Sequence, residues 1–594
     1  MRHLNQSFRH VRALARQLLF LIPLFALGSP VSSVDIIPVD QIRPGARGTG
    51  LTVLSGDSVV QFEVEVIDVM RNVTPRGDLI LCRLSGAGLE HTGVIQGMSG
   101  SPIYIDGRIA GAVAYAWGFS KDPIAGITPI AEMTSIWQQE DNYSGRGRRS
   151  SALGRQLPRT TGCAPLPLPL AVSGLSPRAA EILTPALAEF GLTPVMAASG
   201  RTAMQRESLP RVEPGCAIGV ALADGDVSMA AVGTLTFREG DRILAFGHPM
   251  MQAGPVRMPM IVGTIHGVLP SVASSFKFFS PGPVVGAVTE DRLTGIAGRL
   301  GMDAPMLPVR VRLESPTNSE VYSFRVVQHE ELSPVLLAVG LTDIIFRSEG
   351  TMEETTIESE MVVRFHAAVD TLESRNPPLE LRLRHLLTGP DPVADLFRLV
   401  RSELSMLLEN RFVEIHSDEV LVTLRFRPGR AQAWLTSTTP DRQTVRPGDN
   451  LRIALRLTDY RGRDTICLTD IPIPATARPG RLEIFVGPAD SLLAIESNRA
   501  PGRFEPTDLK GMVELLQRSG NEDRLRIVGL TSSSGFTVSG RELPSAPPSL
   551  RRVLATRPPD RRVEPTFSSV VFEQSLAVGS VVSGVGQFGL EVRE

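Results

Sequence analysis

The chain has 594 residues, of which 42% are hydrophobic, and it carries 61 basic and 63 acidic side chains. This length exceeds what one hydrophobic core usually serves, so we expect several modules. The nearly balanced charge provides no basic surface for nucleic acid or for an anionic membrane, and neither is an expected partner. The four cysteines, at positions 82, 163, 216 and 467, are too scattered for a disulfide framework or a metal site. We expect no metal and no cofactor.

Residues 1–33 have the pattern of a secretory signal peptide. Basic residues precede an apolar run from Leu18 to Leu27, and small residues follow from Gly28 onward. The run is too short to cross a membrane comfortably, and no later apolar stretch approaches about 18 residues. We therefore expect an extracytoplasmic bacterial protein, periplasmic or secreted, whose mature chain begins between Gly28 and Val34 and has no membrane span. An uncleaved anchor is the alternative, because no clean Ala-x-Ala site is present.

The rest of the chain predicts a mainly β protein. Short β-branched runs with period-two alternation are separated by Gly, Pro and Asp-Gly turns, such as the predicted hairpin turn at Asp106 and Gly107. The expected order is a small antiparallel barrel or sandwich at 34–140, a linker at 141–168, a mixed helical connector at 169–214, a second all-β unit at 215–350, a β domain at 351–430, a β-sandwich-like domain at 431–543, a Pro/Arg-rich flexible arm at 544–565 and C-terminal strands at 566–594.

Two helices are predicted within this β framework. The first covers residues 177–190, where Ser176 can cap and Pro177 can occupy the first turn. The second, at 391–410, opens at Asp391 and is the one helix expected among the accessory domains. Its apolar positions form one stripe, which indicates core packing rather than a cofactor site. They are Val393, Leu396, Phe397, Val400, Leu404 and Leu407.

The segment "QGMSGSP" at residues 96–102 raises the possibility of a nucleophilic serine. Gly97 and Gly100 flank Ser99 with residues that tolerate a positive φ, and the amides of Gly97 and Ser99 could form an oxyanion hole. The alternative is a tight turn of small residues. A nucleophile elbow of the α/β-hydrolase type fits less well, because Ser101 replaces its last glycine and no strand–helix alternation surrounds it. We expect Ser101 only to line the turn.

These residues carry a resemblance to known peptidases. "GMSGSP" resembles the G-D-S-G-G-P segment of trypsin-like serine peptidases, and "IQGMSGSPIYIDGRIAGAVAYAWGFSKDPIAGITPI" is closely similar to the SpoIVB peptidase family, over roughly residues 40–135. A second block, "AVGTLTFREGDRILAFGHPM", resembles the histidine segment of that family. The resemblance implies a trypsin-like double β-barrel with its halves in permuted order, in which Ser99 is the nucleophile and His248 the general base.

The resemblance also implies a substrate-binding strand just after the serine. Trypsin-like enzymes pair the substrate backbone with a strand at this place, a form of β-augmentation. The residues concerned here are Val113, Ala114, Tyr115, Ala116 and Trp117.

The chain departs from the family pattern in two ways. The serine block precedes the histidine block, which does not exclude catalysis because catalytic triads occur in several chain orders. The aspartate that the family has before its serine is also missing, since Leu84 or Ser85 stands there. Our candidate for the orienting acid is Asp291, with Asp241 and Asp78 as weaker alternatives.

Other bases remain open. His91 lies eight residues before Ser99, and His266 occurs in "GTIHG". Lysine occurs only at positions 121, 277 and 510, so a Ser–Lys dyad has few possible bases.

The sequence thus leaves two functions in competition. The first is an exported serine endopeptidase that hydrolyses protein or peptide substrates, with a regulatory or self-processing role. The alternative is a catalytically weak or inactive extracytoplasmic scaffold or binding protein on the same fold. The retained Ser99 and His248 favour the peptidase, whereas the missing aspartate and the long C-terminal half favour the scaffold.

Overall fold

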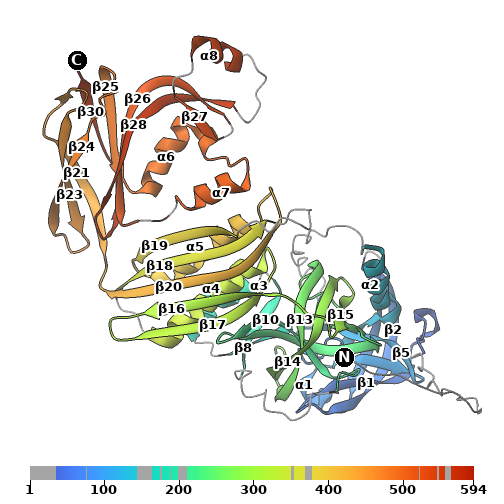
Figure 1. Cartoon of the computed structure of the whole chain (residues 1–594). Coiled ribbons are helices and arrows are strands. Elements are labelled where there is room, and N and C mark those ends of the chain that lie inside the picture. Colours follow the sequence, from blue (N-terminus) through green and yellow to red (C-terminus); the bar gives the residue numbers. More distant parts are fainter. Residues whose placement is uncertain are drawn as a thin grey trace, which may run out of the picture. The chain divides into compact units, whose positions relative to one another are not determined.

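The computed structural model describes residues 35–74, 77–143, 163–173, 177–188, 190–197, 211–349, 354–367, 378–518, 520, 522–538, 540–544, 547–555 and 563–594. These residues are mainly β, as predicted. The elements below lie in one compact unit, Ile36–Glu594 (Figure 1). The predicted signal peptide falls outside the described residues. Within the described ranges, no helix is long and apolar enough to cross a membrane.

The first part of the chain closes into a six-stranded barrel. The strand order is β4-β1-β2-β3-β6-β5, and pairing of β4 with β5 completes the ring. The predicted hairpin turn joins β4 to β5, with both Asp106 and Gly107 at positive φ. The strands are β1 (Arg47–Val53), β2 (Val59–Thr74), β3 (Gly77–Ser85), β4 (Pro102–Ile105), β5 (Arg108–Trp117) and β6 (Ile124–Pro129), with the short helices η1 (Val39–Gln41) and α1 (Leu89–Thr92) and the longer α2 (Ile130–Tyr143).

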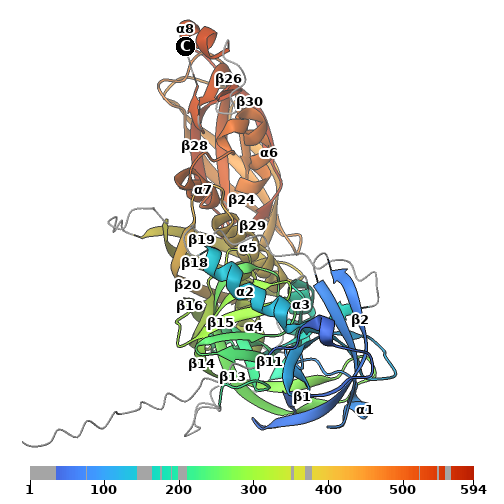
Figure 2. The same cartoon turned by 90° about the vertical axis from the view of Figure 1, so that its right-hand side faces the viewer.

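A second six-stranded ring follows. Its order is β10-β13-β14-β15-β12-β11, closed by pairing of β10 with β11. The strands are β10 (Ala217–Gly225), β11 (Met229–Glu239), β12 (Arg242–Ala245), β13 (Gly254–Leu269), β14 (Phe276–Arg292) and β15 (Gly295–Leu300). The two barrels lie side by side in both views (Figures 1 and 2). The predicted double barrel is therefore confirmed.

The second barrel continues into a larger sheet instead of ending at a domain boundary. β10 also pairs with β17, and β16 pairs in parallel with β20, so the sheet runs on to β19. On the other side β11 pairs with β8. The added elements are β8 (Leu168–Ser173), α3 (Pro177–Ala188), β9 (Leu192–Ala197), β16 (Met306–Glu314), β17 (Ser319–Val327), α4 (Leu332–Glu349), β18 (Thr355–Ala367), β19 (Leu379–Thr388), α5 (Pro392–Leu408) and β20 (Ile415–Pro428).

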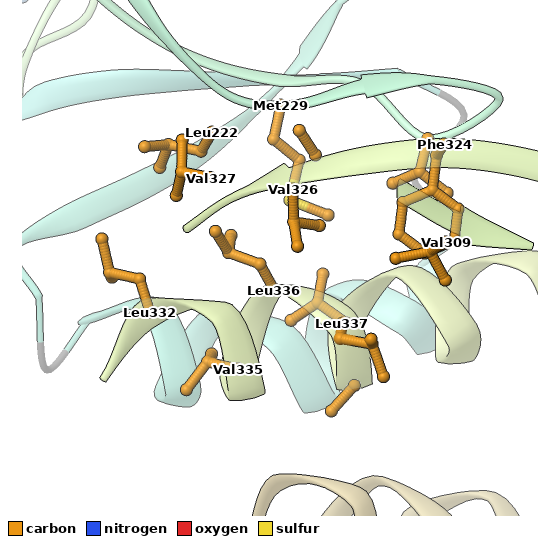
Figure 3. Close-up of a cluster of buried hydrophobic side chains, with 14 of the residues drawn as sticks. Leu222, Met229, Val309, Phe324, Val326, Val327, Leu332, Val335, Leu336 and Leu337 are labelled. Atoms are coloured by element: carbon orange, nitrogen blue, oxygen red, sulfur yellow. The ribbon is translucent and has the colours of Figure 1, made fainter. Parts of the chain in front are cut away.

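Helix α4 was not predicted, because it has no polar face over most of its length. Its side chains from Leu332 to Ile345 are all buried, so the sequence lacks the 3.6-residue periodicity of an amphipathic helix. Figure 3 shows its apolar side chains packed under the strands of the sheet. Helix α5, by contrast, begins at the predicted Asp391 cap, which accepts from the amide of Ala394 at 3.0 Å. All six residues of its predicted stripe are buried.

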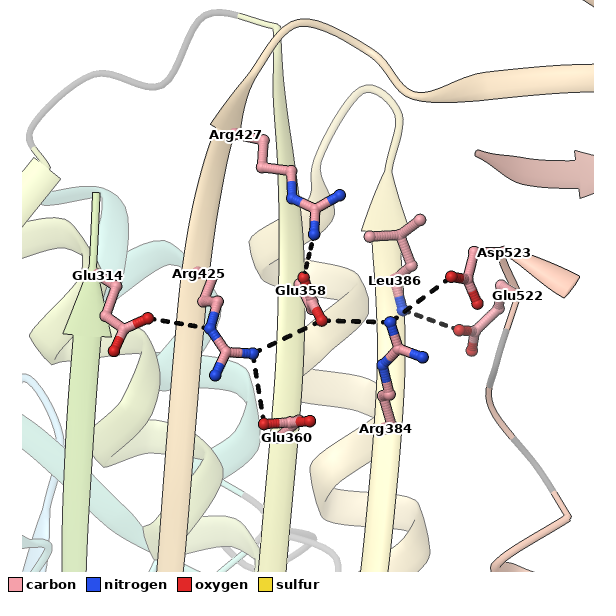
Figure 4. Close-up of polar contacts among 9 residues, drawn as sticks. All are labelled: Glu314, Glu358, Glu360, Arg384, Leu386, Arg425, Arg427, Glu522 and Asp523. Carbon is pink, nitrogen blue, oxygen red and sulfur yellow. Dashed lines mark hydrogen bonds and ion pairs between the residues drawn. The ribbon is translucent and has the colours of Figure 1, made fainter. Parts of the chain in front are cut away.

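Charged side chains cover the opposite face of this extension (Figure 4). Arg425 on β20 contacts Glu314 on β16 at 2.9 Å and Glu358 on β18 at 3.6 Å. Arg384 on β19 contacts Glu358 at 3.2 Å and Asp523 at 3.5 Å. Because strand residues alternate between faces, the row of ion pairs leaves the helix-facing side mostly apolar, with the buried His385 of β19 in contact with Glu403 of α5 as an exception.

The C-terminal part is a two-sheet sandwich around one core. One sheet has the order β24-β23-β21-β29 and the other β22-β30-β25-β26-β27, with β28 added to β26. The elements are β21 (Gln432–Pro440), β22 (Thr444–Val445), β23 (Asn450–Asp459), β24 (Asp464–Pro472), β25 (Gly480–Gly487), α6 (Ala489–Arg499), η3 (Pro501–Arg503), α7 (Leu509–Leu516), β26 (Arg524–Val538), β27 (Arg541–Leu543), α8 (Pro548–Ala555), β28 (Val563–Ala577), β29 (Val581–Ser583) and β30 (Gly586–Val592).

The predicted C-terminal strands are present, and they pair with β21, β25 and β26, so they complete the sandwich. Two expectations need correction. The predicted arm at 544–565 contains helix α8 and the start of β28. The predicted linker at 141–168 ends in strand β7 (Cys163–Pro165), which pairs with β5. Long-range strand pairing gives short polar or Pro-rich segments a structure that their local sequence does not indicate.

Candidate active site

Ser99 lies where two consecutive tight turns meet. The amide of Met98 donates to the carbonyl of Ile95, and that of Ser101 donates to the carbonyl of Met98, both at 2.9 Å. Each turn has a glycine at positive φ, +94° at Gly97 and +92° at Gly100. At Gly100 a Cβ would also lie 2.0 Å from the carbonyl oxygen of Thr234. The glycine frame is thus needed for both the turn and the close approach of β11.

The two amides expected to form an oxyanion hole have no acceptor among the described residues. These are the amides of Gly97 and Ser99. The neighbouring backbone amides each donate to a carbonyl, and they belong to Gln96, Met98, Gly100 and Ser101. The Ser99 hydroxyl is completely buried and likewise lacks a hydrogen-bond partner. Buried polar groups are normally paired. The buried Ser101 hydroxyl in the same pair of turns also lacks a partner. Two unpaired amides beside the unpaired Ser99 hydroxyl therefore favour a binding site for a carbonyl group.

His248 follows a strained stretch of backbone at the end of β12. Phe246 has a φ of +71°, which is uncommon for a residue with a side chain, and Gly247 has the same value. The ring Nδ1 lies 2.8 Å from the carbonyl oxygen of Pro249. A carbonyl can only accept, so Nδ1 carries the proton and the neutral ring presents Nε2 as an acceptor. Burial lowers the pKa of His248 to about 4.

Asp291 binds the loop after His248, not its ring. Its carboxylate accepts from the amides of Met250 and Met251 at 2.8 Å each and from that of Ala253 at 3.2 Å. Burial raises the pKa of Asp291, although these donors oppose the shift. The carbonyl of Pro249 therefore makes the contact with His248 Nδ1 that an orienting acid was expected to make. Asp291 fixes the backbone that carries His248.

The interface between the barrels brings the two predicted residues into neighbouring segments. Thr234 on β11 donates its amide to the Ser99 carbonyl at 2.8 Å, and its own carbonyl accepts from the amide of Phe246 at 3.3 Å. A Cβ on Gly100 would lie 2.5 Å from the nitrogen of Phe246. The Ser99 turn therefore packs directly against the backbone that leads to His248. Ser99 Oγ and His248 Nε2 do not hydrogen-bond each other in this structure.

Lys277 also belongs to the site, although its place in the sequence did not predict a role there. It is fully buried, and its ammonium group donates to the carbonyl of Gly97 at 3.0 Å and to the hydroxyl of Thr52 at 2.9 Å. Burial lowers its pKa to about 7. Thr234 donates to the same Gly97 carbonyl through Oγ1 at 2.9 Å. The available signal was a lysine inside the apolar stretch "SFKFFS", in a chain with only two others.

The alternative bases and acids lie in different settings. His91 is exposed on α1, and His266 is exposed on β13, where Nε2 lies 2.7 Å from Ser280 Oγ. Asp78 forms an ion pair with Arg71 at 2.6 Å. Asp241 is mostly exposed, 3.7 Å from Arg299. Ser101 is buried in the turn, where its carbonyl accepts from Val113 at 3.0 Å. Because Ser99 Oγ has no hydrogen-bond partner among the described residues, none of these groups bonds it.

The strand expected to bind substrate is already paired. On β5, Tyr115 pairs with Pro165, Ala116 with Ala164 and Trp117 with Cys163, all on β7. The carbonyl of Ala114 accepts from the amide of Leu166 at 2.9 Å. The predicted open edge is therefore covered by the chain itself, because β7 extends the sheet beyond the end of β4.

Within the described part of the chain, no group of three or more His, Cys, Asp or Glu side chains could hold a metal ion. Comparisons with curated proteins and with solved structures returned no match to this chain. The comparison with protein families did: residues 30–133, which include Ser99 and all six strands of the first barrel, match the family described as SpoIVB peptidase S55.

Proposed function

We propose that the protein is an exported serine endopeptidase in which Ser99 attacks a peptide carbonyl. The family match of residues 30–133 supports a peptidase, and hence a protein substrate. The observation that carries the proposal is the unpaired set in the Ser99 turn: one hydroxyl and two amides, all without acceptors among the described residues.

In this mechanism His248 Nε2 accepts the proton of Ser99 Oγ as the oxygen bonds to the carbonyl carbon. The amides of Gly97 and Ser99 then donate to the oxyanion of the tetrahedral intermediate. His248 returns the proton to the leaving amine, and water hydrolyses the acyl-enzyme by the same route. Ser99 Oγ and His248 Nε2 must first come within hydrogen-bond distance, since they are not bonded in this structure.

The test is covalent labelling of the full chain with a fluorophosphonate probe, carried to completion and mapped by peptide analysis. We expect labelling at Ser99 that is absent in Ser99→Ala and at least about 100-fold slower in His248→Ala, the usual contribution of a general base. His91→Ala and His266→Ala are matched controls and should label normally. Loss of labelling in either control, with normal labelling of His248→Ala, would assign the base to that residue.

A second candidate function is a binding or scaffold protein on the same fold. It is favoured by the Pro249 carbonyl at His248, since no described carboxylate bonds that ring. A folded wild-type chain that never reacts with the probe and cleaves no protein would support this alternative.

A further inference from the structure

We propose that residues 163–166 are a resident occupant of the β5 edge beside Ser99, the edge that the family resemblance assigns to a substrate strand, and that they must leave before a substrate binds. We call these residues the occupant segment. This proposal rests on the proposed function, and it adds the regulation of the site and the class of peptide that it accepts.

The backbone pairing of β5 places the occupant next to the Ser99 turn. β6 pairs along one edge of β5, so β4 and β7 must share the other edge. Between β4 and β7 on that edge lies Val113, whose carbonyl accepts from Gly100 at 2.7 Å. The next residue, Ala114, accepts from Leu166 at 2.9 Å. Along β5, the first residue bonded to the occupant segment therefore directly follows the residue bonded to the Ser99 turn.

The loop of His248 reaches the same point. A Cβ on Gly247 would lie 3.1 Å from the carbonyl oxygen of Val113 and 3.2 Å from Ala114 Cβ. The carbonyl of Gly247 also accepts from Thr128 Oγ1 on β6 at 2.6 Å. The serine turn, the histidine loop and the occupant segment thus converge on two residues of β5. This convergence is the arrangement expected where a peptide backbone meets catalytic groups.

Burial shows why the occupant has to move. Ser99 is 0% exposed and His248 2% exposed, so an external carbonyl cannot reach either in this state. Leu166 is itself 2% exposed and belongs to the same apolar cluster as Met98 and Val113. The apolar cluster that buries its side chain therefore also contains the residue that directly precedes Ser99. Release of the segment would open both the strand edge and this apolar site.

The occupant also indicates which peptides fit. It has no charged side chain, its Leu166 is buried in an apolar cluster, and Ala164 pairs with the small Ala116. A competing substrate would present a large aliphatic side chain at the Leu166 position and a small one two residues earlier. Main-chain hydrogen bonds to β5 would supply affinity, and these two positions specificity.

The test compares initial rates of fluorophosphonate labelling at Ser99 in the full chain. Leu166→Asp should expel the side chain, because an unpaired charge is costly to bury. Leu166→Ala should weaken the contact with less risk to folding. We expect labelling to accelerate at least about tenfold in Leu166→Asp, a factor equivalent to about 1.4 kcal/mol, and to a smaller extent in Leu166→Ala. Leu379→Asp is the matched control, because it makes the same substitution at an exposed leucine of β19 outside the occupant segment; its labelling rate should equal that of wild type.

A peptide added in trans provides the second measurement. The acetylated peptide amide CAPLPL, which copies residues 163–168, should slow the labelling of Leu166→Asp, and a peptide of the same composition in scrambled order should not. If folded Leu166→Asp and Leu166→Ala label Ser99 at the wild-type rate, the occupant proposal is overturned. Labelling at Ser99 would still support the proposed peptidase in that case. Absence of labelling in every folded variant would overturn both.

Discussion

At the scale of single residues, the site depends on backbone groups held in uncommon positions. Gly97 and Gly100 have positive φ, and Phe246 has it despite its side chain. For Phe246 this conformation costs of order 1–3 kcal/mol and persists only where the surroundings hold it, whereas glycine adopts it without a steric penalty. Here Thr234 provides that support, since it bonds both the Ser99 turn and the backbone of Phe246.

Gly100→Ala should be more damaging than an alanine at another left-handed glycine. Gly107 is the matched control, because its φ is +75° but no atom lies within 4 Å of the Cβ position. Gly107→Ala should cost about 1–2 kcal/mol from the backbone conformation alone. Gly100→Ala adds the overlap with the Thr234 carbonyl and should cost more, with loss of labelling at Ser99. Equal losses of unfolding free energy in denaturant titrations would contradict this reading of the interface.

Lys277→Met should separate positioning of the turn from stability. The methionine fills a similar volume but cannot donate to the Gly97 carbonyl, so the turn loses one of its two side-chain donors. We expect labelling of Ser99 to slow by about tenfold. This factor corresponds to about 1.4 kcal/mol, which is close to the contribution of one hydrogen bond to a charged group. Because a buried lysine is costly to keep charged, the variant should be at least as stable as wild type at pH 6.

Lys277→Gln, which keeps an N–H donor without the charge, should label faster than Lys277→Met. Slower labelling that simply follows a loss of folded protein in both variants would instead assign Lys277 a structural role.

At the scale of elements, one buried histidine joins the extended sheet to the sandwich. His385 on β19 contacts Glu403 on α5 at 2.9 Å and Glu522, just before β26, at 2.7 Å. Burial lowers the pKa of His385, but the two carboxylates outweigh it and raise that pKa to about 10. The imidazolium therefore links three elements that are distant in the sequence.

His385→Gln should destabilise the protein in a pH-dependent way. It leaves the buried carboxylate of Glu403 and the partly buried one of Glu522 without their cation, and loss of one partner of a buried ion pair typically costs about 3–5 kcal/mol. Since the folded-state pKa is raised above about 6.5, the contribution of His385 is complete below pH 6.5 and is lost as pH rises toward 10. The difference in unfolding free energy should therefore be largest at pH 6 and smaller at pH 9.

The matched control is His366→Gln. His366 lies 2.7 Å from Asp418 but is 44% exposed, so its loss should cost about 1 kcal/mol or less. A similar loss of stability in both variants would contradict the role of the buried cluster.

At the scale of the whole molecule, two closed barrels share one interface and the second barrel extends into the remaining sheet. The serine turn comes from the first barrel and the histidine loop, Asp291 and Lys277 from the second. The candidate site therefore exists only when both barrels are folded and packed. The protonation of His248 in this site should therefore be linked to the free energy of unfolding of the chain.

Acidification should destabilise the chain partly through His248. Its pKa is about 4 when folded and near 6.5 when unfolded, so the unfolded state binds the proton first as pH falls. The contribution of His248 is present above pH 6.5 and is lost between pH 6.5 and 4. His248→Ala should therefore lose less unfolding free energy than wild type between pH 7.5 and 4.5, whereas exposed His91→Ala should follow wild type. Parallel loss in all three proteins would contradict the burial of a neutral His248.

Local features were predictable because their causes are local. The period-two runs predicted the mainly β fold, Asp106 and Gly107 predicted their hairpin turn, and the apolar spacing of α5 predicted its buried stripe. The glycines beside Ser99 likewise predicted a turn at positive φ. Helix α4 escaped prediction because burial on all sides removes the periodicity that marks a helix.

Long-range contacts decided the remainder. No local pattern indicates that residues 163–166 would cover β5, that Asp291 would bind three backbone amides rather than an imidazole, or that Lys277 would donate to a carbonyl 180 positions away. The sequence by itself determined the strands, the turns and the serine in its glycine frame, because these follow from residue-level backbone preference. Only the tertiary structure decided which groups meet around Ser99, because the pairing of strands far apart in the chain is set by packing of the complete barrels.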